Sequence, residues 1–262
     1  MNPSLSRSTL ASTLAAVLLG LATAAQAATV QVTVSVENLA PAGGIAFAPL
    51  HVGFHQGVFD GFDEGAAAAA GIVSVAENGS GSAWQPAFAA ADPTATRGTI
   101  GGVLLAGGMA SQTFLVDTAL NPLFTFAAMV VPSNDFFIGN DGATQYPLFD
   151  AAGHLLIAEI MQSAADIWDA GSEAFDPAAA AFVGDASGHT DQNGVVNRNF
   201  AELAQFDGLT TAAGYTFASQ LQSGTPIYRI RFDAQTVPAP ATAWLAVCGL
   251  AGLGATRRRR AG

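Results

Sequence analysis

The sequence predicts an all-β fold, an antiparallel β-sandwich with short helical insertions, flanked by an N-terminal signal peptide and a C-terminal membrane segment. Many short apolar runs alternate with Gly- and Pro-rich turns, and no regular alternation of strands with helices is present. We expect a signal peptide over 1–27 and one sandwich domain over 28–235. A hinge, a short transmembrane segment and a basic sorting tail should occupy 236–262.

The N-terminus has the three parts of a secretory signal. Arg7 precedes the apolar stretch "LAAVLLGLA", and the small residues Ala25 and Ala27 flank Gln26 at a cleavage site. The apolar stretch is short for a permanent membrane helix, which is the alternative. We therefore expect cleavage after Ala27 and export of the domain.

Six segments have the patterns of strands. The first, 29–39, alternates Val30, Val32, Val34 and Val36 with polar residues, the period of a half-buried strand. Apolar runs bounded by turn residues predict further strands over 43–57, within 96–116 and over 122–132 and 153–161. Segment 224–235 alternates arginines with aromatic and aliphatic residues and should be the closing strand.

Helices should be few and short. Alanine has the best helix propensity, so Ala66 to Ala70 could make one or two helical turns between glycines. Segment 201–209, "AELAQFDGL", is a second candidate. We find no internal repeat of fixed period.

The charge is strongly acidic and unevenly placed. All nine basic residues are arginines, and Arg7 and the four at 257–260 lie near the ends. The central region has four arginines against 20 acidic residues, a formal charge of −16. Such a surface repels phosphates, so nucleic acid is not an expected partner and cations are.

The acids crowd most closely in "DIWDAGSEAFDP", which contains Asp166, Asp169, Glu173 and Asp176. Composition alone favours a solvated loop. A second segment, "MVVPSNDFFIGNDG", places Asp135 directly after an apolar strand and turn-forming residues. Calcium takes six to eight oxygen ligands from loops that can wrap it, so carboxylates from two such loops at the rim of a sandwich would suit it.

These two segments resemble the spondin N-terminal domain family. Its members have a Pro-Ser-x-Asp-aromatic element, matched by 132–136, and a downstream Asp-Ala-Gly-Thr/Ser-Asp/Glu element, matched by 169–173. Supporting likenesses are "VTVSVENL", "GVFDGFDEG" and "GIVSVAENGS", and the whole resemblance covers 29 to about 206. It implies a sandwich similar to calcium-dependent phospholipid-binding modules, with calcium held by Asp135, Asp169 and Glu173. Glutamate at the third position is one methylene longer than aspartate.

Other polar residues have plainer interpretations. Asp141, before a glycine, should be a turn residue. The loop "GDASGHTDQNGVV" has Asp185, Asp191 and Asn193 at suggestive spacing but no terminal glutamate of an EF-hand loop, and a surface loop is favoured. His51 and His55, four residues apart in a strand-like run, should be buried or line turns and not bind zinc.

The C-terminus resembles the bacterial PEP-CTERM class of sorting tails. Val237, Pro238, Ala239 and Pro240 stand where that class has a Pro-containing motif, without its usual glutamate between the prolines. About fifteen mostly apolar residues follow, then four arginines that favour the cytoplasmic side. Cys248, the single cysteine, lies in this apolar run and can form no internal disulfide.

No nucleophile elbow, zinc-protease motif or phosphate-binding Gly-Lys loop is present. We therefore expect no enzyme but an exported calcium-binding module at the cell envelope or surface, transiently tethered by its tail, for adhesion to an extracellular protein, glycan or lipid. A structural envelope or matrix component is the alternative. A secreted glycan hydrolase with paired carboxylates is a third class.

Overall fold

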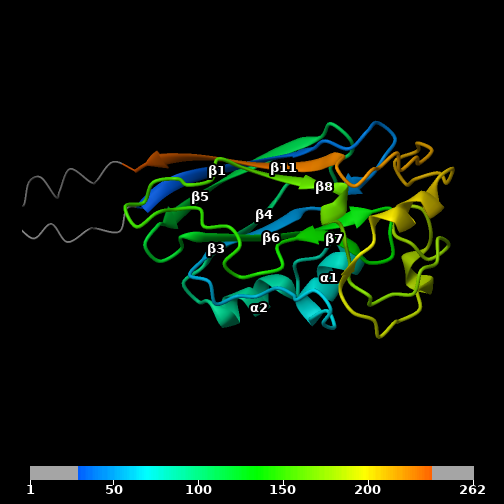
Figure 1. The fold of residues 1–262 in the computed structure, drawn as a ribbon, viewed down its shortest axis with the longest axis horizontal. Helices are drawn as coiled ribbons and strands as arrows, with labels where there is room; N and C mark the ends of the chain where they lie inside the picture. The colour runs from blue at the N-terminus through cyan, green and yellow to red at the C-terminus, as the bar shows by residue number, and fades with distance from the viewer. Residues whose placement is uncertain (1–28, 238–262) are drawn as a thin grey trace, which may run out of the picture.

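A computed structural model describes residues 29–237, which form two antiparallel β-sheets packed face to face and two short helices against the outer face of one sheet (Figure 1). The predicted all-β fold is thus confirmed in its coarse form. The expected signal peptide, the four-arginine tail and Cys248 lie outside the described residues. Within 29–237 the structure contains no helix whose length and apolar character would let it cross a bilayer.

The first sheet has the strand order β5-β1-β11-β8. Its strands are β5 (Met109–Asp117), β1 (Thr29–Asn38), β11 (Pro226–Thr236) and β8 (Glu159–Ser163). The valines of β1 point inward and its polar residues outward, as their alternation predicts. The predicted closing strand is confirmed as β11, which pairs with β1 along its length, from Val30 opposite Thr236 to Asn38 opposite Tyr228.

The second sheet has the order β10-β9-β7-β6-β3-β4, and a short strand, β2, also pairs with β6. The strands are β10 (Asn197–Arg198), β9 (Trp168–Asp169), β7 (Phe136–Gly139), β6 (Leu123–Val131), β3 (Leu50–His55), β4 (Thr96–Ile100) and β2 (Ala46–Phe47). All but one residue of β6 are buried because the sheet is covered on both faces. One face meets the first sheet across the main apolar core, and the other meets the helices.

The helices differ from those expected. Ala66 to Ala69 are not helical, and α1 is Ala70–Asn78, followed by α2 at Trp84–Ala91. Ile72, Val75 and Ala76 have helical spacing and are buried against the sheet, as are Trp84 and Phe88 on α2. Burial of these faces therefore decides where the helices form, against the better intrinsic propensity of the alanine run.

Three short 3₁₀ helices complete the fold: η1 (Ala164–Asp166), η2 (Ala186–Gly188) and η3 (Phe200–Phe206). The last occupies most of the segment predicted as a short helix. Both ends of the described chain lie at one end of the sandwich, where Val30 pairs with Thr236, and the loops between about 170 and 200 lie at the opposite end (Figure 1). That loop-bearing end contains the two acidic motifs.

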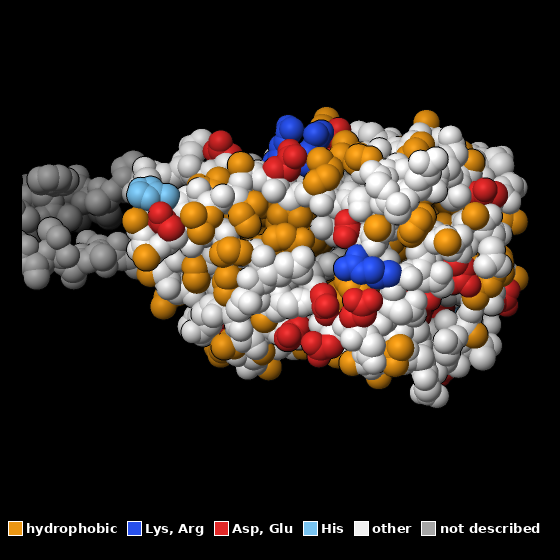
Figure 2. All heavy atoms as spheres, viewed as in Figure 1, with side chains coloured by type: hydrophobic (Ala, Val, Ile, Leu, Met, Phe, Trp, Pro, Cys, Tyr) orange, Lys and Arg blue, Asp and Glu red, His pale blue; other side chains and the backbone are white. Residues whose placement is uncertain are grey.

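Basic side chains are few, and three of the four arginines in 29–237 are next to acids. Arg198 contacts Asp166, Arg229 contacts Glu37 and Arg231 contacts Glu159. On the face shown in Figure 2, the basic side chains form two small groups, each bordered by acids. The acids at the loop-bearing end must therefore find other partners or face one another.

Candidate metal centre

The turn after β6 places Asp135 at the start of β7. Buried Ser133 fixes the turn, because its hydroxyl donates to the carbonyl of Val130 and accepts from the amide of Phe136 at 3.1 Å. The Asn134 side chain holds the segment after the second motif, accepting from the amide of Asp176 at 3.1 Å and donating to its carbonyl. Each polar residue of this motif thus has a positioning role.

Asp135 is 3% exposed and joins the two motifs. Its Oδ2 accepts from the Ser172 amide at 2.6 Å, the Ser172 hydroxyl at 3.2 Å and the Glu173 amide at 2.9 Å. Its Oδ1 accepts no hydrogen bond from any residue in 29–237. One oxygen of this buried carboxylate therefore anchors the second motif, and the other stays available to a ligand.

Strand pairing brings Asp169 next to Asp135. In the β7–β9 ladder, Phe136 lies opposite Asp169. The half-buried Asp169 accepts from the Gly171 amide at 2.7 Å through Oδ1 and from the Asn199 side chain at 3.3 Å through Oδ2. Gly171 has φ +65°, and a Cβ there would lie 2.7 Å from backbone atoms of Val195, so this sharp turn requires glycine.

Glu173 is 7% exposed, and its neighbours are mostly other acids. Burial raises its pKa to about 7, with the charges of Glu77 and Asp135 acting in the same direction and His189 opposing them. Nδ1 of His189 lies 3.6 Å from Oε1 of Glu173, while its Nε2 lies 3.3 Å from Oδ1 of Asp191. The half-exposed histidine is thus the cation nearest to Glu173 when it is protonated.

All three predicted residues line one cavity of about 290 Å³. Burial raises the pKa of Asp135 to about 6, the charge of Asp169 adds to the increase, and the hydrogen bonds from Ser172 and Glu173 oppose it. Burial is the main cause of both raised pKa values, and the charges of neighbouring carboxylates add to it. A hard cation among them would remove that cost.

The same cavity contains residues that sequence reasoning missed. Its remaining polar wall includes Glu202, Asn199, Asn197, Asn134 and Gln192. Burial raises the pKa of the half-buried Glu202, and the charges of Asp169 and then Asp135 raise it further. The one sequence signal for Glu202 is its place in the predicted helix 201–209, which says nothing of its neighbours.

In the part of the chain that the structure describes, no three His, Cys, Asp or Glu side chains converge closely enough to hold one metal ion together. Asp135, Asp169 and Glu173 share a cavity and electrostatic contact, with oxygens of the two aspartates bound to backbone amides. The candidate ligand atoms of these three side chains are all carboxylate oxygens. Calcium accepts a variable number of oxygen ligands, so the cavity fits calcium better than metals that prefer nitrogen or sulfur.

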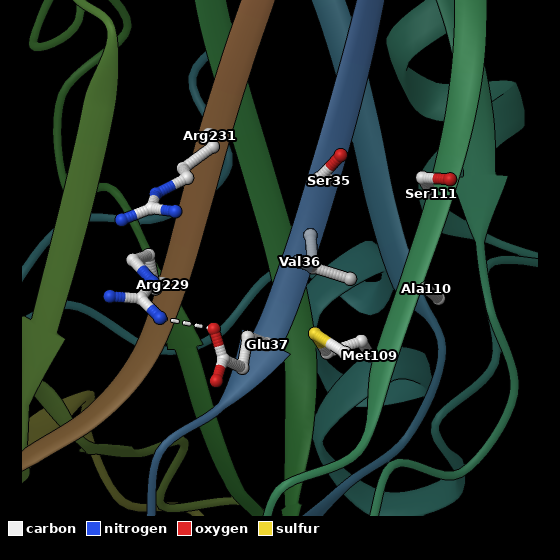
Figure 3. A pocket seen from close by; sticks show the side chains of 8 residues that line it. All are labelled: Ser35, Val36, Glu37, Met109, Ala110, Ser111, Arg229 and Arg231. Atoms are coloured by element: carbon white, nitrogen blue, oxygen red, sulfur yellow. Dashed lines mark hydrogen bonds and ion pairs between the residues drawn. The ribbon is translucent and has the colours of Figure 1, made fainter.

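A second hollow of about 330 Å³ lies on the outer face of the first sheet (Figure 3). Arg229, Arg231, Glu37, Met109 and Ser111 line it. Arg229 forms an ion pair with Glu37, as Figure 3 shows, and Arg231 donates to Glu159 at 2.8 Å. The arginines of this hollow are thus already paired with acids. It is therefore a weaker candidate for a ligand site than the acidic cavity, although it is slightly larger.

The other polar candidates have structural partners. Asp141 accepts from the Glu64 amide at 3.0 Å, which ties its turn to a neighbouring loop. Asp185 caps η2 within an exposed loop, as expected for a surface loop, and Asn193 is exposed there.

Both histidines are buried, as predicted. His51 contacts the Thr99 hydroxyl and the Gly79 carbonyl. His55 accepts from the Gly57 amide and contacts the Thr125 hydroxyl at 2.9 Å.

No protein-family model matches the chain, and no curated protein matches it either. The likeness to spondin N-terminal domains therefore rests on the sequence motifs alone.

Proposed function

We propose that this chain is an exported, spondin-like calcium-binding module of the cell envelope or surface that serves adhesion or ligand binding. The observation that carries the proposal is the acidic cavity, in which Asp135, Asp169 and Glu173 come together from two distant segments. An oxygen of buried Asp135 without a protein donor supports the same proposal. Calcium would neutralise the cluster and stabilise the loops that provide it.

The position of the cavity fits display on a membrane tether. The chain enters and leaves the sandwich at one end, and the cavity lies at the other (Figure 1). A tether at the C-terminal tail would therefore direct the cavity away from the membrane. The partner would be an extracellular protein, glycan or lipid that meets the loop-bearing end.

Calorimetric titration of calcium into the metal-stripped protein tests the proposal. We expect saturable binding and a higher melting temperature with calcium, because a ligand that binds only the native state stabilises it by about 2.7 kcal/mol at a hundredfold excess over Kd. Asp135→Asn and Asp169→Asn should remove both effects. Asp141→Asn is the matched control, since Asp141 loses the same charge outside the cavity. Absence of binding at millimolar calcium by folded protein would refute the proposal.

A glycan hydrolase is the second candidate, favoured by one observation. Asp135 and Glu173 have pKa values raised to about 6 and about 7, and a pair of carboxyls in that range can act as general acid and base. A hydrolase would lose turnover in Asp135→Asn and would act on glycans in the presence of chelator. A binding module shows no turnover in a broad glycosidase screen, and chelator weakens its capture of ligand.

A further inference from the structure

The hollow on the outer face of the first sheet arises where short side chains lie beside long ones. Ser35 is opposite Ser111 on one neighbouring strand and opposite Arg231 on the other. Met109 and Arg229 belong to the next row of the same face, two residues along each strand. The serines therefore form the floor of the hollow, and the longer side chains form its walls (Figure 3).

The two arginines of the hollow have hydrogen-bond donors that the protein does not use. Arg229 is bound to Glu37 through Nη2 and Arg231 to Glu159 through Nε, and neither guanidinium donates to any other residue in 29–237. A guanidinium has five N–H donors. The Nε of Arg229 is buried without a partner, so its ion pair leaves it incompletely satisfied. Figure 3 shows both guanidinium groups on the same side of β11.

The floor of the hollow adds two hydroxyl groups. Ser35 and Ser111 are exposed, and the side chain of neither has a hydrogen-bond partner among the described residues. Hydrogen bonds from guanidinium groups to carboxylates are stronger than those between neutral groups, and the planar guanidinium matches the two oxygens of a carboxylate. The donors of the hollow thus fit a carboxylate.

The charge around the hollow differs from that of the rest of the domain. Two of the four arginines in 29–237 line it. Their two acidic partners, Glu37 and Glu159, bring the local charge to zero. At physiological ionic strength, exposed charges more than about 8 Å apart are largely screened. The strongly acidic domain therefore does not prevent an anion from binding here.

An independent observation is the apolar rim beside the hollow. Met109 lines the hollow and is 73% exposed, while Val103 and Leu105 of the preceding loop are 56% and 40% exposed. The sequence has no charged residue between Arg97 and Asp117. Large apolar side chains that are grouped on a surface, next to a polar hollow, are typical of a ligand site.

The loop of the rim is held firmly at its base. Buried Leu104 exchanges backbone hydrogen bonds of 2.8 and 3.1 Å with Phe47. The Asn38 side chain donates to the carbonyl of Leu104 at 2.9 Å, and the Asn38 backbone bonds to Gly107 and Gly108. The exposed apolar side chains are thus presented by a fixed backbone, so little conformational entropy is lost when a ligand covers them.

We propose that this hollow binds an alkyl carboxylate. The carboxylate lies at Arg229, Arg231 and the two serines, and the alkyl chain covers Met109 and the loop over 101–108. A volume of about 330 Å³ is at the lower end of ligand pockets, which suits the head of such a molecule while its chain continues along the rim. This site is separate from the acidic cavity and does not depend on calcium.

Titration of octanoate into the protein, followed by heteronuclear NMR, tests the proposal. Acetate has the carboxylate without the chain, and 1-octanol has the chain without the charge. We expect octanoate to bind with a Kd in the millimolar range or lower, and to shift the amide signals of Ser35, Ser111 and Met109. Acetate and 1-octanol should each bind at least about tenfold more weakly.

Four variants assign the two parts of the ligand to residues. Arg231→Gln should weaken octanoate binding about tenfold, whereas Glu159→Gln, which frees the Arg231 guanidinium from outside the hollow, should strengthen it. General damage to the fold would not produce tighter binding. Met109→Ala should weaken binding about threefold or more. Leu115→Ala is its matched control, because Leu115 is on the same strand, is 60% exposed and does not line the hollow.

Each part of the proposal can be overturned separately. Folded protein that shows no octanoate binding at millimolar concentration refutes the site. Equal binding of acetate and octanoate, or an unchanged affinity in Met109→Ala, refutes the role of the apolar rim. Unchanged affinity in both Arg231→Gln and Glu159→Gln refutes the role of the arginines, and Glu159→Gln alone decides this point if Arg231→Gln does not fold.

Discussion

Replacing Asp135 with asparagine should change how the stability of the metal-free protein depends on pH. The folded-state pKa of Asp135 is raised from 3.8 to about 6, chiefly by burial and then by the charge of Asp169. Glu173 and Glu202 also interact with this carboxylate, while amides of Ser172 and Glu173 donate to it. Its negative form is thus unfavourable in the native state.

The sign and size follow from linkage. Because the folded pKa lies above the unfolded one, the stability associated with the bound proton is fully present below pH 3.8 and is lost as pH rises through about 6. The whole difference corresponds to about 3 kcal/mol. With these two pKa values, about 1.4 kcal/mol of it is lost between pH 5 and pH 8.

Urea unfolding of the wild-type protein and Asp135→Asn in EDTA measures this loss at pH 5 and pH 8. The difference between the two proteins removes the contributions of His51, His55 and other groups that titrate in both. The wild-type protein should lose about 1.4 kcal/mol relative to the variant on going to pH 8. Asparagine keeps an acceptor for the amides of the second motif, so the variant should fold.

Calcium provides the second arm of the experiment. At pH 8 it should restore stability to the wild-type protein and have little effect on Asp135→Asn, because the ion replaces the proton as the positive partner of the cluster. A stability difference that stays constant with pH, or that grows in favour of the wild-type protein in EDTA, would show that Asp135 is not a repelled carboxylate.

Three further predictions concern the scaffold and the ends of the chain. Burial lowers the pKa of His55 to about 4, so stability present above pH 6.5 should be lost as pH falls toward 4, by up to about 3 kcal/mol, and His55→Gln should show less of this loss in urea unfolding at pH 7 and pH 4.5. An added Cβ at Gly53 would lie 2.0 Å from the Phe88 ring, so Gly53→Ala should displace α2 and cost about 1–3 kcal/mol in thermal unfolding, whereas Gly102→Ala, with open space around it, should not. Exported protein should begin at residue 28 by N-terminal sequencing, and deletion of 244–260 should release it into the medium; Met1 at the start, or unchanged fractionation, would contradict these expectations.

The strands could be predicted because their burial follows a local period. Val30 to Val36 alternate, and β6 is a continuous apolar run between turn residues, so sequence alone indicates both. The alanine run is a misleading signal, because Ala66 to Ala69 are not helical and α1 begins only at Ala70. The apolar residues of α1 and α2 recur at helical intervals, and that signal was present in the sequence.

The site depends on pairings that no local pattern reveals. Strands β9 and β10 have two residues each, yet they bring Asp169 next to Asp135 and Asn199 next to Asp169. The first of these meetings was expected through the family likeness. The second was not, because Asn199 belongs to neither motif and its position depends on the register of two very short strands.

A comparison within the molecule shows how this chain buries a carboxylate for structural reasons. Asp92 is fully buried and accepts from the Gln56 amide at 3.1 Å and from the amide and hydroxyl of Thr94 at 2.9 and 2.6 Å. Burial acts to raise its pKa, but these hydrogen bonds outweigh it and leave the pKa below the usual value.

Asp135 and Glu173 differ from Asp92 in having other carboxylates as neighbours. Each faces other carboxylates, each has a raised pKa, and one oxygen of Asp135 has no donor among the described residues. The fold can satisfy a buried acid, as Asp92 shows, so the repulsion in the cavity is specific to that place. Buried like charges are favourable only where a positive partner compensates them, so the proposed function predicts that calcium stabilises the protein most at a pH where both acids are ionised.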